Sequence, residues 1–485
     1  MTIRRRPAAA ISTTIVKWGA CWGVLVLFVL APGGCERSAG PQAKNALAHG
    51  WQAYESRDYD KAIAEYSDAI RLDPTNTLAY NNRGLAYYEK GDVDKAMADY
   101  DAAIRFDPKL AKAYSNRSLA YQKRGEIDKA IADCTEAIRL DPREAMAYNN
   151  RGFAFAAKGD LNKALADYDA AIQRDPSLGR AYSNRSMVYQ KKGELDSAIA
   201  DCDQAIRLNG RDAAAYNNRG FTHLDKGDVD KALADLDRAI ELDPKMSRAY
   251  SNRGLAYQKK GELSKSIADC TEAIRLDPSE ALAYNNRGFA FAENGELDKA
   301  LADYDAAISI NPKLAKPYSN RSTIYESRGD LIRAIADCTE AIRLDPDDAA
   351  AYSNRGMAHY KQGDADKALA DYDAAIRLAP KLARAYSNRS LVWGQKGELD
   401  KSIADCNEAI RLNPREALAY NNRAVAYYKK GDIDRAINDC TEAIRVDPNL
   451  VLAYLNRGAA YLKKGDKAKA KADFDEAKKL GYKPT

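Results

Sequence analysis

An asparagine recurs along this chain every 34 residues, and its side chain is a candidate for binding chemistry. It is found twelve times, as Asn82, Asn116, Asn150, Asn184, Asn218, Asn252, Asn286, Asn320, Asn354, Asn388, Asn422 and Asn456. A carboxamide both donates and accepts hydrogen bonds, so it can bond both polar groups of a peptide unit. A row of these amides would hold an extended polypeptide by its backbone, with little demand on sequence. Alternatively, the asparagines only cap or solvate a helix face and bind no ligand.

An arginine directly follows each asparagine, and an aspartate lies sixteen residues after the arginine, as in Arg117 and Asp133. A half-buried guanidinium group without a carboxylate partner is costly. The recurrence therefore predicts one ion pair per repeat, and the alternative is a ligand contact by the arginine. The first repeat departs at both positions together, with His49 and Glu65.

Eight cysteines and three histidines raise the question of a metal site or disulfides. Six of the cysteines share one place in the repeat: Cys134, Cys202, Cys270, Cys338, Cys406 and Cys440. Copies on neighbouring repeats would be at least about 8–10 Å apart, whereas a disulfide needs Cα atoms within about 7 Å. We therefore expect small buried thiols. The histidines are too scattered for a metal cluster, and no nucleophile–base pair or phosphate loop stands out. The sequence predicts a protein that is not an enzyme and has no metal or cofactor.

Tyrosines at the same interval define the elements that must position these side chains. Counting back three residues from each gives thirteen units of 34 residues over 43–484, with starts at 43, 77, 111, 145, 179, 213, 247, 281, 315, 349, 383, 417 and 451. In the unit from Ala111, Tyr114 and Tyr121 fall on one face of a first helix, which Gly125 breaks. A second helix follows and ends before Pro142. The prediction is an all-α array of helical hairpins, since a strict period in this range is typical of a solenoid.

This unit resembles the tetratricopeptide repeat. The resemblance rests on aromatic residues at positions 4 and 11, a small residue at 8, Ala at 20 and 27, Tyr, Cys or Phe at 24, and Pro at 32. It implies a right-handed superhelical solenoid whose first helices line a concave groove that binds other proteins. Arginine at position 7 is a departure, because the family often has leucine there. The asparagines resemble the ladder in the superhelical domain of O-linked N-acetylglucosamine transferase, a family member, and this likeness implies peptide binding without that enzyme's catalytic domain.

Position 2 carries a basic residue in alternate units: Lys112, Arg180, Arg248, Lys316 and Arg384. Basic side chains at this spacing would favour an acidic partner, and the alternative is an ordinary solvated residue left by duplication of a two-hairpin block. A family mode that clamps a terminal carboxylate uses Lys or Arg at positions 5 and 9. Here position 5 is Asn or Ser in eleven units and position 9 is almost always apolar, so that mode is disfavoured.

Residues 1–35 differ from the repeats. A basic start, MTIRRR, precedes an uncharged run over 18–31, which is shorter than the roughly 20 residues that a membrane-spanning helix needs. The order of basic, apolar and small residues predicts an export signal or anchor, with 36–42 as a linker. The residues before Cys35 resemble a bacterial lipoprotein signal, which implies lipidation of Cys35, although Pro32 departs from that pattern. Ordinary signal cleavage, an uncleaved anchor and a cytoplasmic chain are the alternatives.

The net charge of +5 contains four basic residues that precede the first acidic one, so the remainder is nearly neutral and gives no case for nucleic acid. We expect a non-catalytic scaffold on the cell envelope, membrane-anchored with its repeats in the periplasm. It would bind extended or acidic segments of other proteins. The alternatives are a structural spacer or assembly factor that uses its convex surface, and a regulator of a membrane-associated enzyme complex.

Overall fold

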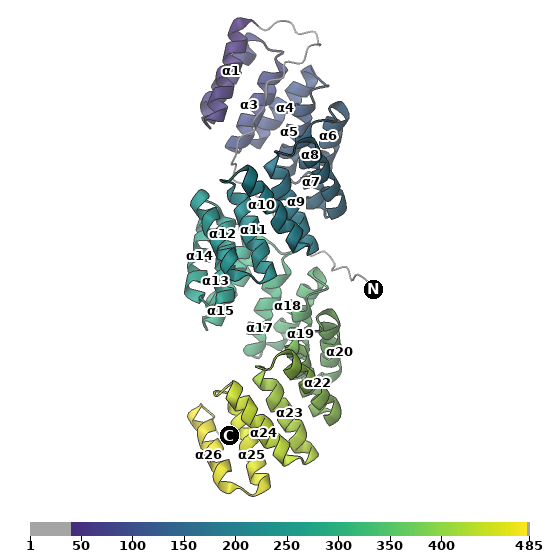
Figure 1. Ribbon diagram of the computed structural model, residues 1–485, viewed down its shortest axis with the longest axis vertical. Coiled ribbons are helices and arrows are strands. Elements are labelled where there is room, and N and C mark those ends of the chain that lie inside the picture. The colour runs from purple at the N-terminus through teal and green to yellow at the C-terminus, as the bar shows by residue number, and fades with distance from the viewer. Residues whose placement is uncertain (1–39, 483–485) are drawn as a thin grey trace. The chain divides into compact units, whose positions relative to one another are not determined.

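The computed structural model describes residues 40–482, and every regular element in that range is an α-helix. The 26 helices alternate as first and second helices of thirteen hairpins (Figure 1). The prediction of an all-α hairpin array is therefore confirmed. The predicted signal at 1–35, with Cys35, lies outside the described residues.

The hairpins follow the predicted register closely. The first helices are α1 (Pro41–Glu55), α3 (Thr77–Lys90), α5 (Ala111–Lys123), α7 (Ala145–Lys158), α9 (Gly179–Lys192), α11 (Ala213–Lys226), α13 (Ser247–Lys260), α15 (Ala281–Glu293), α17 (Ala315–Ser327), α19 (Ala349–Gln362), α21 (Ala383–Gln395), α23 (Ala417–Lys430) and α25 (Val451–Lys464). The second helices are α2 (Tyr59–Leu72), α4 (Val93–Phe106), α6 (Ile127–Leu140), α8 (Leu161–Arg174), α10 (Leu195–Leu208), α12 (Val229–Leu242), α14 (Leu263–Leu276), α16 (Leu297–Ile310), α18 (Leu331–Leu344), α20 (Ala365–Leu378), α22 (Leu399–Leu412), α24 (Ile433–Val446) and α26 (Lys467–Lys479).

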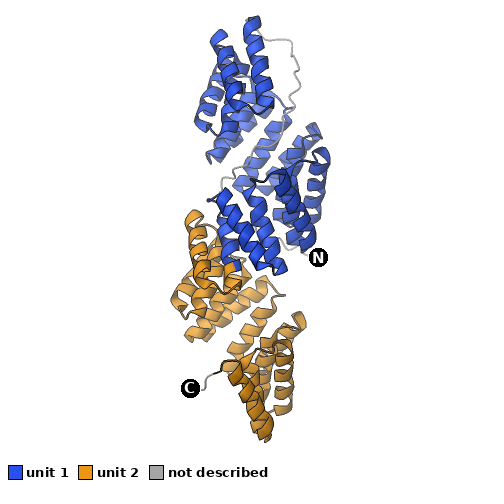
Figure 2. Cartoon of the chain, turned by 90° about the vertical axis from the view of Figure 1, so that its left-hand side faces the viewer, with its two compact units in different colours: residues 1–290 blue, residues 291–485 orange. Residues whose placement is uncertain are grey.

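The chain divides into two compact units, residues 1–290 and 291–485 (Figure 2). Within each unit a helix packs on its hairpin partner and on the next hairpin. First helices of neighbouring hairpins also contact one another, as α5 does α7 and α19 does α21, whereas no two second helices do so among the described residues. The first helices therefore lie on the inner side of each unit, where hairpins are closest together.

Each hairpin turns at position 15, where the backbone is left-handed. Gly91 has φ of 93° and Gly431 has φ of 87°, and twelve units have glycine there. Glycine adopts this conformation without steric cost. The first unit uses Arg57 instead, with φ of 63°. The second helices end as predicted: Asp141, before proline, is extended with φ of −134° and ψ of 95°.

Inside each hairpin, the residue at position 8 is matched to the residue at position 24. A Cβ atom on Gly152 would lie 2.9 Å from the ring of Tyr168, so the large ring needs a glycine opposite it. Where position 24 is cysteine, position 8 is serine in four of six hairpins, and the Cys338 thiol donates to Ser322 Oγ over 3.1 Å. The exceptions are Gly254 opposite Cys270 and Ala424 opposite Cys440. The residue at position 8 is thus smallest where the side chain at position 24 is largest, an adjustment that close packing favours.

The cysteines behave as predicted. The six that fall within the described residues are buried, and none of them forms a disulfide there. Burial raises the pKa of the Cys134 thiol to about 12, against a small opposing effect of its hydrogen bond with Ser118. These thiols are therefore neutral packing groups at physiological pH.

Candidate functional site

Positions 2, 6, 9 and 13 of the first helices form one stripe on the inner side of each unit, which we call the first-helix face. On α5 these are Lys112, Asn116, Leu119 and Lys123. Helical geometry places them on one side of the helix. Lys112 is exposed and the other three are half-buried, so side chains of this face reach solvent.

The asparagines of this face are more enclosed than the sequence suggests. Each is buried or half-buried, and most donate a hydrogen bond to the preceding first helix. Asn116 Nδ2 donates to Asn81 Oδ1 over 3.0 Å, and Asn150 Nδ2 donates to the Ser115 carbonyl over 3.3 Å. From the sequence alone, only a bound peptide, a helix cap or solvent are expected as partners of this side chain. In the structure its amide nitrogen also joins neighbouring hairpins.

The amide oxygens fall into two classes, according to position 5 of the same helix. In four hairpins position 5 is an asparagine that donates to the oxygen, as Asn149 Nδ2 donates to Asn150 Oδ1 over 3.2 Å. Where position 5 is serine, the oxygen has no such donor. Among the described residues none donates to Oδ1 of Asn116, Asn184 or Asn252, although their nitrogens are engaged. These three oxygens remain available as acceptors on the first-helix face.

The arginines form the predicted ion pairs. Arg117 donates from Nε and Nη2 to both Asp133 oxygens over 2.7 and 2.8 Å, and its side chain is only 17% exposed. These bonds hold the pKa of the Arg117 guanidinium well above its usual range. The same bidentate pair joins Arg83–Asp99, Arg151–Asp167, Arg185–Asp201, Arg219–Asp235, Arg253–Asp269, Arg321–Asp337, Arg355–Asp371, Arg389–Asp405, Arg423–Asp439 and Arg457–Asp473.

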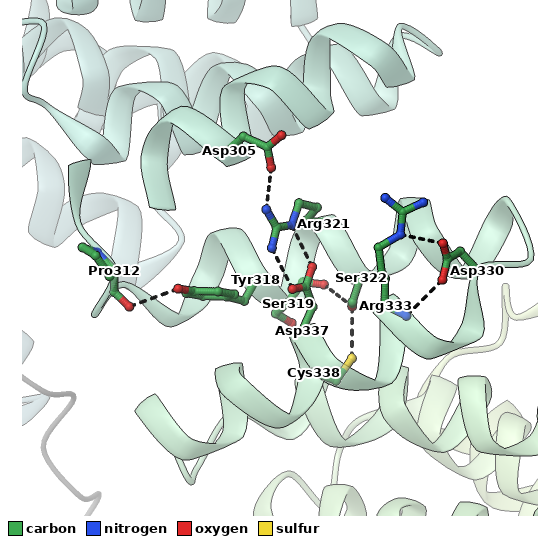
Figure 3. Close-up of polar contacts among 10 residues, drawn as sticks. All are labelled: Asp305, Pro312, Tyr318, Ser319, Arg321, Ser322, Asp330, Arg333, Asp337 and Cys338. Carbon is green, nitrogen blue, oxygen red and sulfur yellow. Dashed lines mark hydrogen bonds and ion pairs between the residues drawn. The ribbon is translucent and has the colours of Figure 1, made fainter. Parts of the chain in front are cut away.

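Each arginine also reaches back to the preceding hairpin, a contact that sequence reasoning missed. Figure 3 shows Arg321 between Asp337 of its own hairpin and Asp305 of α16, to which Nη1 donates over 2.5 Å. The acceptor always stands at position 25, where aspartate, threonine, serine or asparagine occurs. The polar residues at position 25 were the feature of the sequence that could have indicated this contact. The arginine is therefore a structural link within and between hairpins.

The basic residues at position 2 have acidic neighbours within the chain. Lys316 Nζ lies 3.2 Å from Asp348 Oδ2, just before α19. Burial raises the pKa of Glu280 and Arg248 lowers it in part, and Lys112 acts in the same way on Glu144. Burial also raises the pKa of Asp212, and Arg180 lowers it in part. Arg384 is exposed on α21. An acidic residue 32 positions after each cation thus balances part of its charge, which the sequence reading did not anticipate.

This arrangement makes stability depend on pH at Glu280. Because its folded-state pKa is raised, the folded chain binds more protons than the unfolded chain above the ordinary pKa, and stability falls as pH rises through that window. Glu280→Gln should therefore raise the midpoint of thermal unfolding at pH 7 and leave it nearly unchanged at pH 4. Glu136→Gln is the control, because Arg139 lowers the pKa of that exposed carboxyl group. A lower midpoint for Glu280→Gln at pH 7 would mean that attraction to Arg248 outweighs burial.

In the first compact unit the first-helix face curves enough to bring distant hairpins within electrostatic reach. Burial raises the pKa of Glu89 on α3, and the guanidinium group of Arg180 on α9 lowers it in part. Arg180 also acts on the pKa of Tyr54 at the end of α1. Charged and aromatic groups separated by more than 90 residues thus lie within electrostatic reach of each other.

Two other kinds of site, a cluster of metal ligands and a membrane-spanning helix, are not found among residues 40–482. No three His, Cys, Asp or Glu side chains in this range gather as metal ligands would. None of its helices combines the length and the apolar character that crossing a bilayer requires.

Comparisons with known proteins agree with this architecture. Family models described as Tetratricopeptide repeat match residues 47–111, 116–178, 179–212, 247–280, 281–314, 322–392, 417–450 and 451–480, and one described as TPR repeat matches 223–261 and 394–431. Comparison with curated proteins gives no match.

Among solved structures, the APC/C hetero-tetramer Cut9–Hcn1 is similar over 86% of this chain and 96% of that one, with a TM-score of 0.54 and 15% identity. A tetratricopeptide repeat protein from Parabacteroides merdae is similar over 52% of this chain and 100% of that one, with a TM-score of 0.42 and 19% identity. The likeness to Cut9–Hcn1 concerns the fold alone. Since the family models cover most of both compact units, and the hairpins carry the matching positions, the chain belongs to the tetratricopeptide repeat family.

Proposed function

We propose that this chain is a non-catalytic scaffold that binds extended segments of other proteins along its first-helix face. Repeats of this family indicate a scaffold for protein–protein interaction. The observation that carries the finer proposal is the set of amide oxygens without a donor, on Asn116, Asn184 and Asn252. The nitrogen of the same amide group holds this acceptor in place, and no residue within 40–482 donates to it, so it suits a backbone N–H of a partner.

The geometry favours recognition of backbone over sequence. The available oxygens occur on every second first helix, namely α5, α9 and α13. A bound segment would therefore meet one acceptor for each pair of hairpins. A single hydrogen bond contributes a net of about 0.5–1.5 kcal/mol. Several in a row, with apolar contacts at position 9 such as Leu119 and Met187, give useful affinity without demanding a particular sequence.

Charge would add only a modest preference for acidic segments. Lys112, Arg180, Lys316 and Arg384 are exposed on the first-helix face, which supports attraction to carboxylates. The internal acidic neighbours, such as Asp348 beside Lys316, weaken that attraction. We therefore infer that the extended conformation of the partner matters more for binding than its acidic side chains.

The proposed location is the cell envelope, with the repeats in the periplasm. It is supported by the lipoprotein-like order of residues 1–35. Lipid attached at Cys35 would anchor the scaffold to the membrane. Mass spectrometry of the mature N-terminus tests this: an intact Met1 or a terminus at another residue would count against lipidation.

Matched sets of asparagine substitutions test the binding proposal. One variant carries Ala at positions 116, 184 and 252, whose oxygens are available. The other carries Ala at 150, 218 and 286, whose oxygens already accept from position 5. Each substitution in either set removes the link from the amide nitrogen to the preceding hairpin, which is a single bond except at Asn150 and Asn286, where it is shared between two serine oxygens. Peptides selected on the wild-type chain from a random display library should bind the first variant about tenfold or more weakly, which corresponds to about 1.4 kcal/mol, and the second variant nearly normally.

Circular dichroism must first show equal helix content in the two variants. If the wild type and both variants bind with equal affinity, the asparagines are not part of the binding surface. Equal weakening of both would assign them a purely structural role.

A further inference from the structure

The hairpin α23–α24 breaks the volume matching between positions 8 and 24. In alternate hairpins of the array a glycine faces a large side chain, as Gly84 faces Tyr100 and Gly356 faces Tyr372. By the same alternation α23–α24 should carry a large residue at position 24. It has Ala424 and Cys440 instead, so no ring fills the space.

The next hairpin does not compensate for the missing ring. Position 9 of α25 is Ala459, where α21 has Leu391 and α23 has Val425. A hollow of about 160 Å³ results, with Ala424, Cys440 and Ala459 in its lining. We call it the Cys440 pocket. Cys440 is 1% exposed whereas Tyr428, also in the lining, is 37% exposed, so the pocket extends from the surface to the hairpin interior.

The size and lining of the pocket suit one aromatic ring. An apolar cavity of about 150 Å³ in a protein interior binds benzene. The Cys440 pocket is slightly larger, and alanine, valine, tyrosine and cysteine side chains line most of it. Its lining also contains Lys429, whose Nζ donates to the Gly394 carbonyl over 2.8 Å. The charge is therefore held by the neighbouring hairpin.

Asn456 gives the pocket a polar group. Its Nδ2 donates to Asn421 Oδ1 over 2.8 Å, which fixes the orientation of the amide. No described residue donates to Asn456 Oδ1, and position 5 of this helix is Leu455, which has no polar side chain. The oxygen is thus an acceptor without a donor beside an apolar hollow.

The surrounding surface is also apolar. Leu418 and Leu452 stand at position 2 of α23 and α25, and are 41% and 52% exposed. Leu462 is 51% exposed at position 12 of α25. Position 2 alternates between basic and apolar residues up to Leu418, and Leu452 breaks the alternation, so two successive first helices present leucine only at this end of the array. Exposed leucines around an apolar hollow favour a partner that buries apolar side chains.

We propose that the Cys440 pocket receives the phenyl ring of a phenylalanine in an extended segment of a partner protein, with a nearby backbone N–H donating to Asn456 Oδ1. The inference rests on the proposed binding function and adds a residue-specific anchor to it. The asparagines of the other hairpins read backbone, whereas this pocket selects one side chain and so fixes the register of the bound segment.

A variant that fills the pocket with the chain's own ring tests the proposal. Ala424→Gly with Cys440→Tyr recreates the pairing of Gly84 and Tyr100, in which a Cβ on the glycine would meet the ring at 2.9 Å. The matched control is Ser322→Gly with Cys338→Tyr, which makes the same exchange in α17–α18. Ala459→Leu is a second way to fill the pocket, using a residue that position 9 carries elsewhere.

The probes are peptides from a random display library, selected on the full-length chain and then synthesised for calorimetry. We expect peptides selected on the wild type and on the control to share a phenylalanine. Its replacement by alanine should weaken binding about tenfold, as the loss of one buried aromatic side chain implies. Replacement by tryptophan should also weaken binding, because the indole is larger. Both filled variants should lose this dependence while melting at or above the wild-type temperature.

Two results would overturn the proposal. One is that filled variants bind the same peptides with the same dependence on phenylalanine. The other is that peptides selected on the wild type share no aromatic residue. If such peptides still need Asn116, Asn184 and Asn252, the proposed binding function stands and only the pocket assignment fails. If the wild type selects no peptide at all, both fail.

Discussion

Replacing Asp133 with alanine should lower the free energy of unfolding of its region by about 3–5 kcal/mol, because it leaves a mostly buried guanidinium group without its carboxylate. Arg117 would lose two hydrogen bonds of 2.7 and 2.8 Å and keep its hydrogen bond to Asp101 and its place beside two tyrosine rings. In a repeat array such a loss acts on nearest neighbours first. Amide hydrogen exchange should therefore show the largest loss of protection in α5 and α6.

Two further variants isolate the cause. Glu136→Ala removes an exposed pair with Arg139, 34% and 68% exposed, and should cost less than about 1 kcal/mol. Arg117→Met with Asp133→Leu replaces the pair by apolar groups and should recover much of the loss. If Asp133→Ala proves as mild as Glu136→Ala, the ion pair is a surface interaction in energetic terms.

Exchanging the two residues matched in α7–α8 should show strong coupling between them. Tyr168→Cys alone leaves a cavity and should cost about 3–5 kcal/mol. Gly152→Ser alone forces a side chain to within 2.9 Å of the ring, and such overpacking should cost about 1–3 kcal/mol. The double variant recreates the pairing of Ser322 and Cys338, so it should be more stable than Tyr168→Cys alone.

Denaturant unfolding of the wild type, both single variants and the double variant gives the coupling energy directly. A favourable coupling of about 0.5–3 kcal/mol is expected for residues in contact. Strict additivity would show that positions 8 and 24 tolerate each partner independently, and that their alternation along the sequence has no packing cause.

The hairpins and their internal ion pairs could be predicted because their determinants lie within one repeat. Gly125 ends a helix by its own backbone preference, and Arg117 and Asp133 recur together. The contact from Arg117 to Asp101 was missed because it joins two repeats, and a helical wheel of one helix contains no neighbour. The same limit applies to Asn116, whose nitrogen is engaged by Asn81 of the preceding hairpin.

The division of the array after Ala290 lies within α15, and the 34-residue register continues through it without a change of pattern. The acidic neighbours of the basic residues were also missed, although Lys316 and Asp348 have a fixed spacing. Interactions between residues 32 positions apart can be recognised only when the structure shows that the end of a 34-residue unit lies beside the start of the first helix of that unit. The Cys440 pocket required knowledge of which side chain faces which, since a tyrosine missing from an alternation does not by itself show that a space stays open.

The repeated bonds that the arginines and asparagines make between hairpins run in one direction along the chain, although Gln122 and Gln190 donate the opposite way. Arg117 donates to Asp101, and Asn150 donates to the Ser115 carbonyl, so donors belong to the later hairpin and acceptors to the earlier one. During synthesis on the ribosome the amino-terminal hairpins emerge first. Each completed hairpin therefore presents a finished set of acceptors on which the next can dock, and growth of the array has a built-in direction that matches translation.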